Sequence, residues 1–113
     1  LLTPYSADSK EEKSAAFTAK YEEKYGEIPT QFSADTYDCV YVIYQALKDG
    51  VINADMSAEE ICEAMIAYMP TVTVDGVTGV MTWNAAGEVS KTPYAAVIKD
   101  GAYVGADNVE EAQ

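Results

Sequence analysis

The chain has 113 residues, 49% of them hydrophobic, which is enough for one folded domain and too few for two of ordinary size. Seven basic residues stand against 19 acidic ones, and the resulting net charge of −12 repels phosphate backbones and anionic lipid headgroups. We therefore expect no nucleic-acid partner and no membrane-surface partner. The sequence contains no histidine, the most frequent general base and metal ligand, so we expect no enzyme, no catalytic residue, no cofactor and no metal.

A short β segment is expected at residues 1–4, and residues 9–26 (SKEEKSAAFTAKYEEKYG) are typical of an amphipathic surface helix. Ser9 is the predicted N-cap, and Glu12 completes a capping box three residues later. Gly26 predicts the end of the helix. Aromatic residues recur at a spacing of four on one face of this helix: Phe17, Tyr21 and Tyr25.

Residues 33–50 (SADTYDCVYVIYQALKDG) predict a second helix, with Ser33 and Asp35 as N-cap candidates. The apolar run Cys39–Tyr44 makes this helix hydrophobic on more than one face. Such a helix is expected to be buried and packed from two sides. Gly50 is expected to end it.

A third, shorter helix is predicted within residues 56–70 (MSAEEICEAMIAYMP), again with a capping box, formed by Ser57 and Glu60, and with Pro70 as its end. One stripe of this helix is apolar: Ile61, Met65 and Tyr68.

The remainder reads as β structure. Residues 71–83 are β-branched and punctuated by glycines, residues 84–88 form a turn, and residues 93–105 predict two strands around a Lys-Asp-Gly turn. Residues 106–113 are polar and expected to fray. Three helices followed by three or four strands could form a free-standing α+β domain. The doubly apolar second helix fits that arrangement poorly, because a thin domain offers it one partner layer.

Cys39 and Cys62 lie among apolar residues in two predicted helices, and we expect both to be small core residues. The alternative is a disulfide between them. A disulfide requires Cα atoms within about 7 Å, which two neighbouring helices seldom offer, so we expect free thiols.

Five short patterns occur in a fixed order and together resemble one family. The segment from TPYS through YDCVYVIYQAL, with GVTG and VIKDG after it, is similar to the later part of the type I solute-binding proteins of ABC transporters, in particular the branched-chain amino acid (Leu/Ile/Val) binding family. The patterns are Thr3 to Ser6, Phe17 to Pro29, Tyr37 to Tyr41, Gly76 to Trp83 with Gly87, and Val97 to Gly101.

The resemblance implies an α/β, periplasmic-binding-protein-like type I fold, of which this chain would be the C-terminal segment only. Proteins of this family have two lobes joined by three crossing strands, hold a small ligand in the cleft and deliver it to an ABC permease outside the cytoplasm. They are roughly three times as long as this chain. Residues 1–92 would be mainly first-lobe elements after a crossover, and residues 93–113 the return strand and terminal hairpin. The implied hinge crossings are Pro4, Tyr5, Pro93 and Tyr94.

The resemblance also implies ligand contacts. The aromatic residue that matches Phe32 touches the aliphatic side chain of the ligand in the family; the alternative is a hydrophobic staple for the helix of Phe32 itself. Ser33 and Tyr37 are further candidates, with N-cap and core roles as alternatives. The family's groups for the ligand's ammonium and carboxylate lie upstream of Leu1, so we expect no amino-acid binding by this chain alone. Cys39 stands where the family usually has alanine.

Other chemical motifs have simpler explanations. Adjacent carboxylates on a helix point about 100° apart and form a solvated face rather than an acid–base pair. Asp75, Asn84 and Glu88 match no calcium loop and suit turns. Gly76 and Gly79 precede neither a lysine nor a helix, so they form no phosphate loop.

Three functions remain open. The first is an ABC-transporter binding protein for a small amino acid, branched-chain as first candidate; the second is a ligand-sensing receptor ectodomain of the same fold. The third is an independent α+β interaction module. A start at LLTPYS favours the first two, since it resembles the interior of a longer protein. If covering strands are missing, the chain should self-associate, either through the edge of the Val77 to Trp83 strand or through one face of the apolar second helix: Val40, Ile43, Tyr44 and Leu47.

Overall fold

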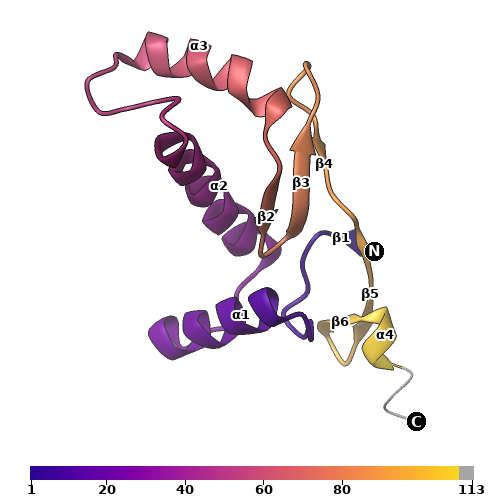
Figure 1. Ribbon diagram of the computed structural model, residues 1–113. Coiled ribbons are helices and arrows are strands. Elements are labelled where there is room, and N and C mark those ends of the chain that lie inside the picture. Colours follow the sequence, from indigo (N-terminus) through magenta and orange to yellow (C-terminus); the bar gives the residue numbers. More distant parts are fainter. Residues whose placement is uncertain (110–113) are drawn as a thin grey trace.

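The structure is a computed structural model, which describes residues 1–109. Figure 1 shows its elements in chain order. The helices are α1 (Glu12–Tyr25), α2 (Gln31–Lys48), α3 (Ala58–Tyr68), the 3₁₀ turn η1 (Met69–Thr71) and α4 (Ala106–Val109). The strands are β1 (Leu2–Thr3), β2 (Val74–Gly76), β3 (Gly79–Trp83), β4 (Val89–Ser90), β5 (Tyr94–Lys99) and β6 (Ala102–Gly105).

The predicted order, helices followed by strands, is confirmed, with five strands after α3 in the described part of the chain instead of three or four. The predicted fraying of residues 106–113 is wrong for its first half, because residues 106–109 form α4; the rest lies outside the described residues. None of the helices in residues 1–109 is both long and apolar enough to span a membrane.

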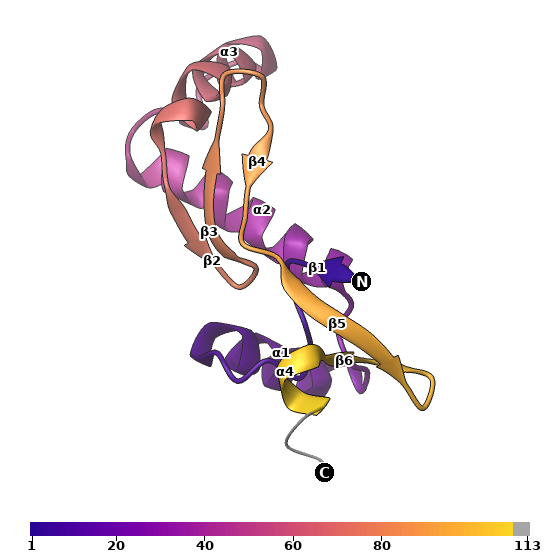
Figure 2. The same ribbon diagram turned by 90° about the vertical axis from the view of Figure 1, so that its right-hand side faces the viewer.

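The strands form two separate antiparallel sheets, ordered β1-β5-β6 and β2-β3-β4. Figure 2 shows α2 and α3 beside the β2-β3-β4 sheet, and the β5–β6 hairpin extending away from it. β1 pairs with β5 through Leu2↔Ala95 and Thr3↔Tyr94, so the first residues of the chain lie against a strand near its end. The chain passes from one sheet to the other between β4 and β5.

The predicted turn between β5 and β6 is confirmed. Asp100 and Gly101 both have positive φ, 52° and 82°, which is the requirement of a two-residue type I′ hairpin turn. An Asp-Gly pair tolerates this conformation better than most others, because glycine has no Cβ and aspartate can bond its own backbone. The hairpin is therefore encoded locally.

Two of the three predicted helix starts are wrong. The N-cap of α1 is Glu11, without a side-chain cap bond, and the Ser9 hydroxyl accepts from the Glu11 N–H at 3.2 Å instead. The N-cap of α2 is Thr30, whose hydroxyl accepts from the Ser33 N–H at 3.4 Å, so Ser33 and Asp35 lie inside the helix. Helix α2 begins earlier than predicted, because Thr30 is the first capping residue after Pro29.

The third helix start is confirmed. The Ser57 hydroxyl accepts from the Glu60 N–H at 3.2 Å, and a Glu60 carboxylate oxygen accepts from the Ser57 N–H at 2.7 Å. Both bonds of a capping box are therefore present.

The apolar residues form two small cores. One joins the N-terminal loop, α1 and α2 through Tyr5, Phe17, Ala34 and Val77. The other lies between α2, α3 and the β2-β3 hairpin. Its buried members are Val42, Val74 and Met81, with Met65, Met69, Val72 and Trp83 packed around them.

Helix α2 is packed on one side only, so the predicted two-sided packing is wrong for the described part of this chain. Its buried positions are Ala34, Asp38, Val42 and Ala46. On another side, the apolar face defined by Val40, Ile43, Tyr44 and Leu47 is 48 to 61% exposed. We call these four residues the bare face of α2.

Both cysteines are free, as predicted, and both are exposed, so their predicted core role is wrong. Cys39 lies on α2 next to the bare face, and Cys62 lies on α3, a helix without a fully buried residue. Only one narrow stripe of α2 is buried and no residue of α3 is fully buried, so neither cysteine is covered.

Tyr68 near the end of α3 has a strongly raised pKa. Partial burial and the hydrogen bond that its hydroxyl donates to Asp49 (2.6 Å) raise the pKa of Tyr68 to about 12. Because the folded-state pKa exceeds that of the unfolded chain, the bond contributes fully below about pH 10, as long as Asp49 is ionised, and is lost as the pH rises through about 12.

An absorbance titration of tyrosinate measures this ionisation directly. Substitution of Tyr68 by phenylalanine should remove the phase near pH 12, whereas Tyr103→Phe, in an exposed strand position, should leave it unchanged. If the phase near pH 12 disappeared in Tyr103→Phe and not in Tyr68→Phe, its assignment to Tyr68 would be wrong.

Candidate ligand-binding site

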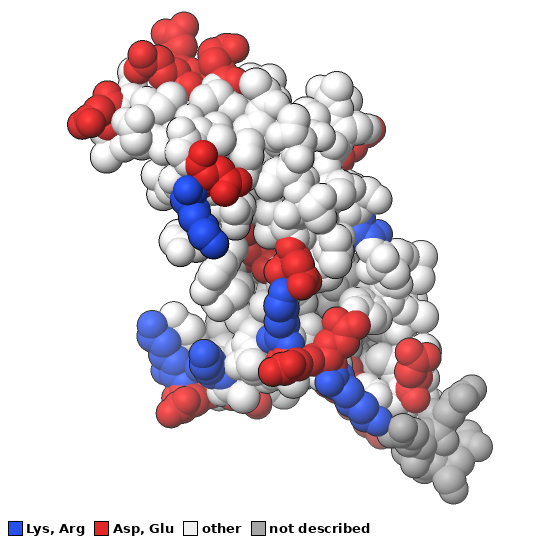
Figure 3. All heavy atoms as spheres, in the orientation of Figure 1, with Lys and Arg blue, Asp and Glu red and all other residues white. Residues whose placement is uncertain are grey.

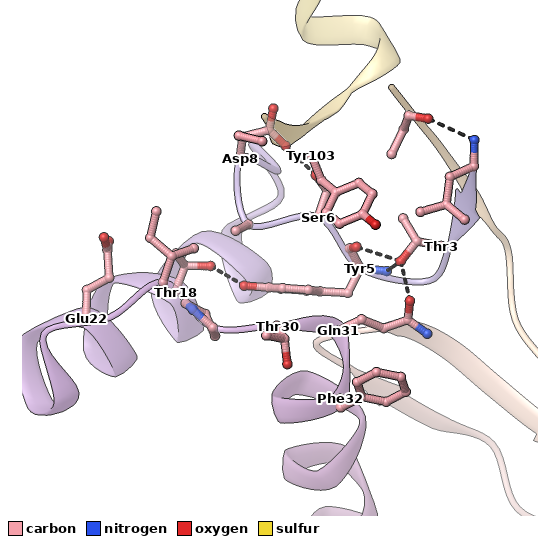
Figure 4. Close-up of a pocket in the computed structure, with 16 residues that line it drawn as sticks. Thr3, Tyr5, Ser6, Asp8, Thr18, Glu22, Thr30, Gln31, Phe32 and Tyr103 are labelled. Atoms are coloured by element: carbon pink, nitrogen blue, oxygen red, sulfur yellow. Dashed lines mark hydrogen bonds between the residues drawn. The ribbon is translucent and has the colours of Figure 1, made fainter. Parts of the chain in front are cut away.

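A cavity of about 680 Å³ lies where the two ends of the chain meet α1 and α2. Its lining comes from residues 1–8, the segment 28–32 that leads into α2, and residues 96–103 of the β5–β6 hairpin, with Thr18 and Glu22 from α1. Figure 4 shows these walls converging on an open space. The lining is mostly apolar and aromatic with a few hydroxyl and carboxyl groups, which is typical of small-molecule sites.

Phe32 is in the first turn of α2 and borders this cavity. Its ring is 76% exposed and lies next to Gln31 in the close-up (Figure 4). The staple alternative is wrong, because a staple residue precedes the N-cap, and here Pro29 holds that position. Phe32 is thus an uncovered aromatic ring at a cavity, and its ligand contact stays a prediction.

The two segments that carry the predicted hinge residues meet where β1 pairs with β5. Tyr5 is 4% exposed, and its hydroxyl lies 2.6 Å from that of Thr18. Burial raises the pKa of Tyr5, partly opposed by this bond. Tyr94 pairs with Thr3, and burial and a hydrogen bond to Glu11 raise its pKa. Pro4 and Pro93 flank these pairs, and a hinge role for all four stays a prediction.

Asp38 is a buried residue of α2 whose role the sequence did not indicate. It is 2% exposed, and its carboxylate accepts from the Val77 N–H (2.8 Å), the Thr78 N–H (2.9 Å) and the Thr78 hydroxyl (2.6 Å). Gly76 approaches it so closely that a Cβ there would lie 2.5 Å from the carboxylate atoms. The YDC and GVTG patterns are therefore two halves of one contact.

Neither a protein-family model nor a curated protein matches the sequence. Several solved structures match the fold. A protein assigned by inference to branched-chain amino acid ABC transport, from Rhodospirillum rubrum, matches over 91% of this chain and 29% of its own, with 26% identity and a TM-score of 0.66. The fold of this chain is that of a segment of an ABC-transporter solute-binding protein.

Two further matches are solute-binding proteins of Rhodopseudomonas palustris, each 18% identical to this chain. One, in complex with 3,4-dihydroxybenzoic acid, matches 90% of this chain and 27% of its own with a TM-score of 0.67. The other, in complex with benzoate, matches 93% and 28% with a TM-score of 0.64. The chain spans less than a third of the length of these three proteins. All three are transport proteins, which confirms the prediction that this chain is not an enzyme.

Within this solute-binding fold, Ser33 and Tyr37 lie away from the cavity that Phe32 borders. The Tyr37 ring packs 4.9 Å from the rings of Phe17 and Tyr41, and its hydroxyl donates to that of Tyr41 at 3.2 Å. This bond, followed by burial, raises the pKa of Tyr37. In this chain Ser33 and Tyr37 therefore make structural contacts, and a ligand contact for them stays a prediction.

The charge at the cavity is negative. Among the described residues its lining includes Asp8 and Glu22 but no lysine. Burial acts to raise the pKa of Asp8, but hydrogen bonds from Ser6, Asn108 and the Gly105 N–H outweigh it and lower that pKa. Asp8 thus fastens β6 and α4 to the N-terminal loop, and Glu22 is the other carboxylate among the lining residues. Figure 3 shows an acidic cluster elsewhere, at the start of α3.

The structure also shows where the three residues considered for a calcium loop lie. Asn84 and Glu88 close the β3–β4 turn, where the Asn84 side chain accepts from the Glu88 N–H at 3.0 Å and donates to its carboxylate at 2.6 Å. Asp75 forms an exposed ion pair with Lys13. The turn interpretation of Asn84 and Glu88 is confirmed, whereas it is wrong for Asp75, which lies in β2 and pairs with Val80.

Proposed function

We propose that this chain is the C-terminal segment of a two-lobed solute-binding protein that captures a small molecule outside the cytoplasm and delivers it to an ABC permease. The observation that carries this is the match of over 90% of the chain to less than a third of such a protein, at 26% identity in one case. A receptor ectodomain of the same fold would differ in the sequence downstream of this segment, and a transmembrane helix later in the reading frame would favour it.

The proposed division of the chain follows its two sheets. Residues 1–92 would be mainly first-lobe elements after a crossover, and residues 93–113 the return strand and hairpin. The passage from the β2-β3-β4 sheet to β5 supports a boundary there, as does the pairing of β1 with β5, which sets two crossing segments against each other.

The bare face of α2 supports the segment interpretation over the free-standing module. A stable monomer rarely leaves four neighbouring apolar side chains half exposed on one helix face. In the intact protein we propose that strands of the first lobe cover this face, as the family resemblance implies for this helix.

For the ligand, we propose a small amino acid, with branched-chain ones as first candidates. The exposed ring of Phe32 offers an apolar contact suited to an aliphatic side chain. The benzoate and dihydroxybenzoate complexes make aromatic acids the second candidate. Within residues 1–109 the cavity lining offers a benzoate carboxylate no lysine, whereas Glu22 favours a ligand that carries an ammonium group.

The ligand prediction is tested by calorimetry on two proteins, this chain and the full product of its reading frame. The chain alone should bind leucine, isoleucine, valine and benzoate more weakly than about 1 mM, because one aromatic contact cannot offset the entropy of association. The full product should bind one of them at least about a hundredfold more tightly. Micromolar binding by the chain alone would contradict the segment proposal.

Self-association of the isolated chain is a consequence of the bare face of α2. We expect a dimer or larger assembly at roughly tens of micromolar, because apolar surface without a partner is reburied by mass action. Ile43→Glu should shift the chain toward monomer, while Ile66→Glu, at a similarly exposed site on α3, should not. Size-exclusion chromatography with light scattering measures this, and a monomeric wild-type chain would show that the bare face needs no cover.

A further inference from the structure

A line of polar side chains connects β1 to the first turns of α2. The Thr3 hydroxyl lies 2.8 Å from Oε1 of Gln31 and equally far from the Tyr5 carbonyl oxygen, so its single proton serves one of them at a time. The Gln31 amide in turn donates through Nε2 to the Asp35 carboxylate at 3.5 Å, the longest step. Figure 4 shows Gln31 reaching toward Thr3, with Phe32 directly after it on the helix.

The line continues from α2 into the segment before β5. Lys91 donates from Nζ to Oδ1 of Asp35 at 3.0 Å and to the Thr78 hydroxyl at 2.6 Å. The side chains of Lys91 and Asp35 are only 16% and 31% exposed. The Thr78 hydroxyl donates to Asp38, so the ammonium group lies over a buried acceptor network rather than in solvent. A charged pair held in this way is stronger than an exposed one.

These contacts close into a ring. Lys91 lies three residues before Tyr94, and Tyr94 pairs with Thr3 across β1 and β5. Starting at Thr3, the ring runs through Gln31, Asp35 and Lys91 along the chain to Tyr94 and back to Thr3. Segments far apart in sequence thus share one closed set of contacts.

We propose that Gln31, Asp35 and Lys91 are positioning residues that hold the first turn of α2, and with it the Phe32 ring, against the paired strands β1 and β5. Phe32 itself forms no part of the ring of contacts, and its side chain is exposed. Its place at the cavity is therefore set by its neighbours Gln31 and Asp35. The inference rests on the proposed function, in which Phe32 touches the ligand and β1 and β5 cross between the lobes.

Amide hydrogen exchange of the ligand-free 113-residue chain tests the positioning. Three amides report on it: Ala34, which donates to Thr30 O in the first turn of α2; Ala96, which donates to Leu1 O across β1 and β5; and Ile61, which donates to Ser57 O in α3. Lys91→Met should speed exchange at Ala34 and Ala96 together by at least about tenfold and leave Ile61 within about twofold. Lys91→Arg should restore protection in part, because it keeps donors for Asp35.

Two further variants make the result specific. Gln31→Leu breaks the connection to Thr3 and Asp35 but spares the Lys91 contacts, and it should also speed exchange at Ala34 and Ala96. Lys99→Met removes an exposed lysine at the end of β5 and should change none of the three amides. Acceleration at Ile61 equal to that at Ala34 would reveal uniform destabilisation and overturn the proposal, as would unchanged exchange at Ala96. The readout needs no ligand, so its failure is distinct from failure of the binding proposal, which calorimetry decides.

Discussion

Replacement of Asp38 by alanine is expected to lower the free energy of unfolding by about 3 to 5 kcal/mol. The carboxylate is 2% exposed and accepts three hydrogen bonds, so its removal leaves the N–H groups of Val77 and Thr78 buried without acceptors. A domain of this size is stable by only about 5 to 15 kcal/mol, so the variant should be close to unfolding.

Urea unfolding followed by the fluorescence of Trp83 measures this loss. The matched control is Asp75→Ala, since Asp75 is exposed and its ion pair with Lys13 contributes at most about 1 kcal/mol. A loss below about 1 kcal/mol for Asp38→Ala would show that water replaces the carboxylate and that the YDC–GVTG contact is not a main source of stability.

Gly76→Ala is expected to cost about 1 to 3 kcal/mol for a steric reason. The added Cβ would lie 2.5 Å from three atoms of the Asp38 carboxylate, which is itself fixed by its three hydrogen bonds. Backbone freedom is not the reason, because Gly76 is not among the residues with positive φ. Gly105→Ala is the control: it also has ordinary φ, but its nearest atoms are side-chain ends at 3.3 Å or more.

Combining the two changes separates their causes. If the clash with Asp38 is the whole cost, Gly76→Ala should be nearly neutral in the Asp38→Ala background, with a coupling energy of about 2 kcal/mol between the two sites. Should Gly76→Ala cost the same in both backgrounds, the steric explanation would be wrong. Because Asp38→Ala alone is close to unfolding, the comparison is made in a stabilising osmolyte such as sucrose.

Some features written in a few adjacent residues could be predicted from the sequence, although the capping box expected of Ser9 and Glu12 is absent. The capping box of α3 and the Asp100-Gly101 turn depend on neighbours three residues away or fewer, and both are correct. The start of α2 was misplaced, because Thr30, Ser33 and Asp35 are all good caps and the choice depends on the chain before them. Long-range order came from the family resemblance, which placed five weak patterns in one fold.

Burial was harder to predict. An apolar residue tends to be buried, but its sequence context does not show which element covers it. The bare face of α2 looked like the inside of a core, and no element within residues 1–109 covers it fully. Asp38 is the opposite case. A carboxylate directly before the apolar run Cys39–Tyr44 was the available signal, but its donors lie 39 and 40 residues further on and were not recognised.

The candidate site could be predicted only in part for the same reason. Phe32 was found through the family pattern, and the structure places it at the cavity edge. The opposite wall is made by the β5–β6 hairpin, whose approach to residues 1–8 depends on the pairing of β1 and β5. No local pattern indicates such a pairing, because a two-residue strand carries almost no periodic signal.

The junction of the two chain ends also bears on how the protein is made. The backbone nitrogen of Leu1 donates to the carbonyl oxygen of Ala96, across a separation of 95 residues. On a ribosome, β1 must therefore wait, unpaired, until almost all of this segment has been synthesised, while α2 and the β2-β3 hairpin can already pack together. Closing so long a loop is costly in entropy and slow. The cavity is expected to be the last part of the segment to assemble. If a ribosome stalls before β5, the cavity lacks the wall that the β5–β6 hairpin forms.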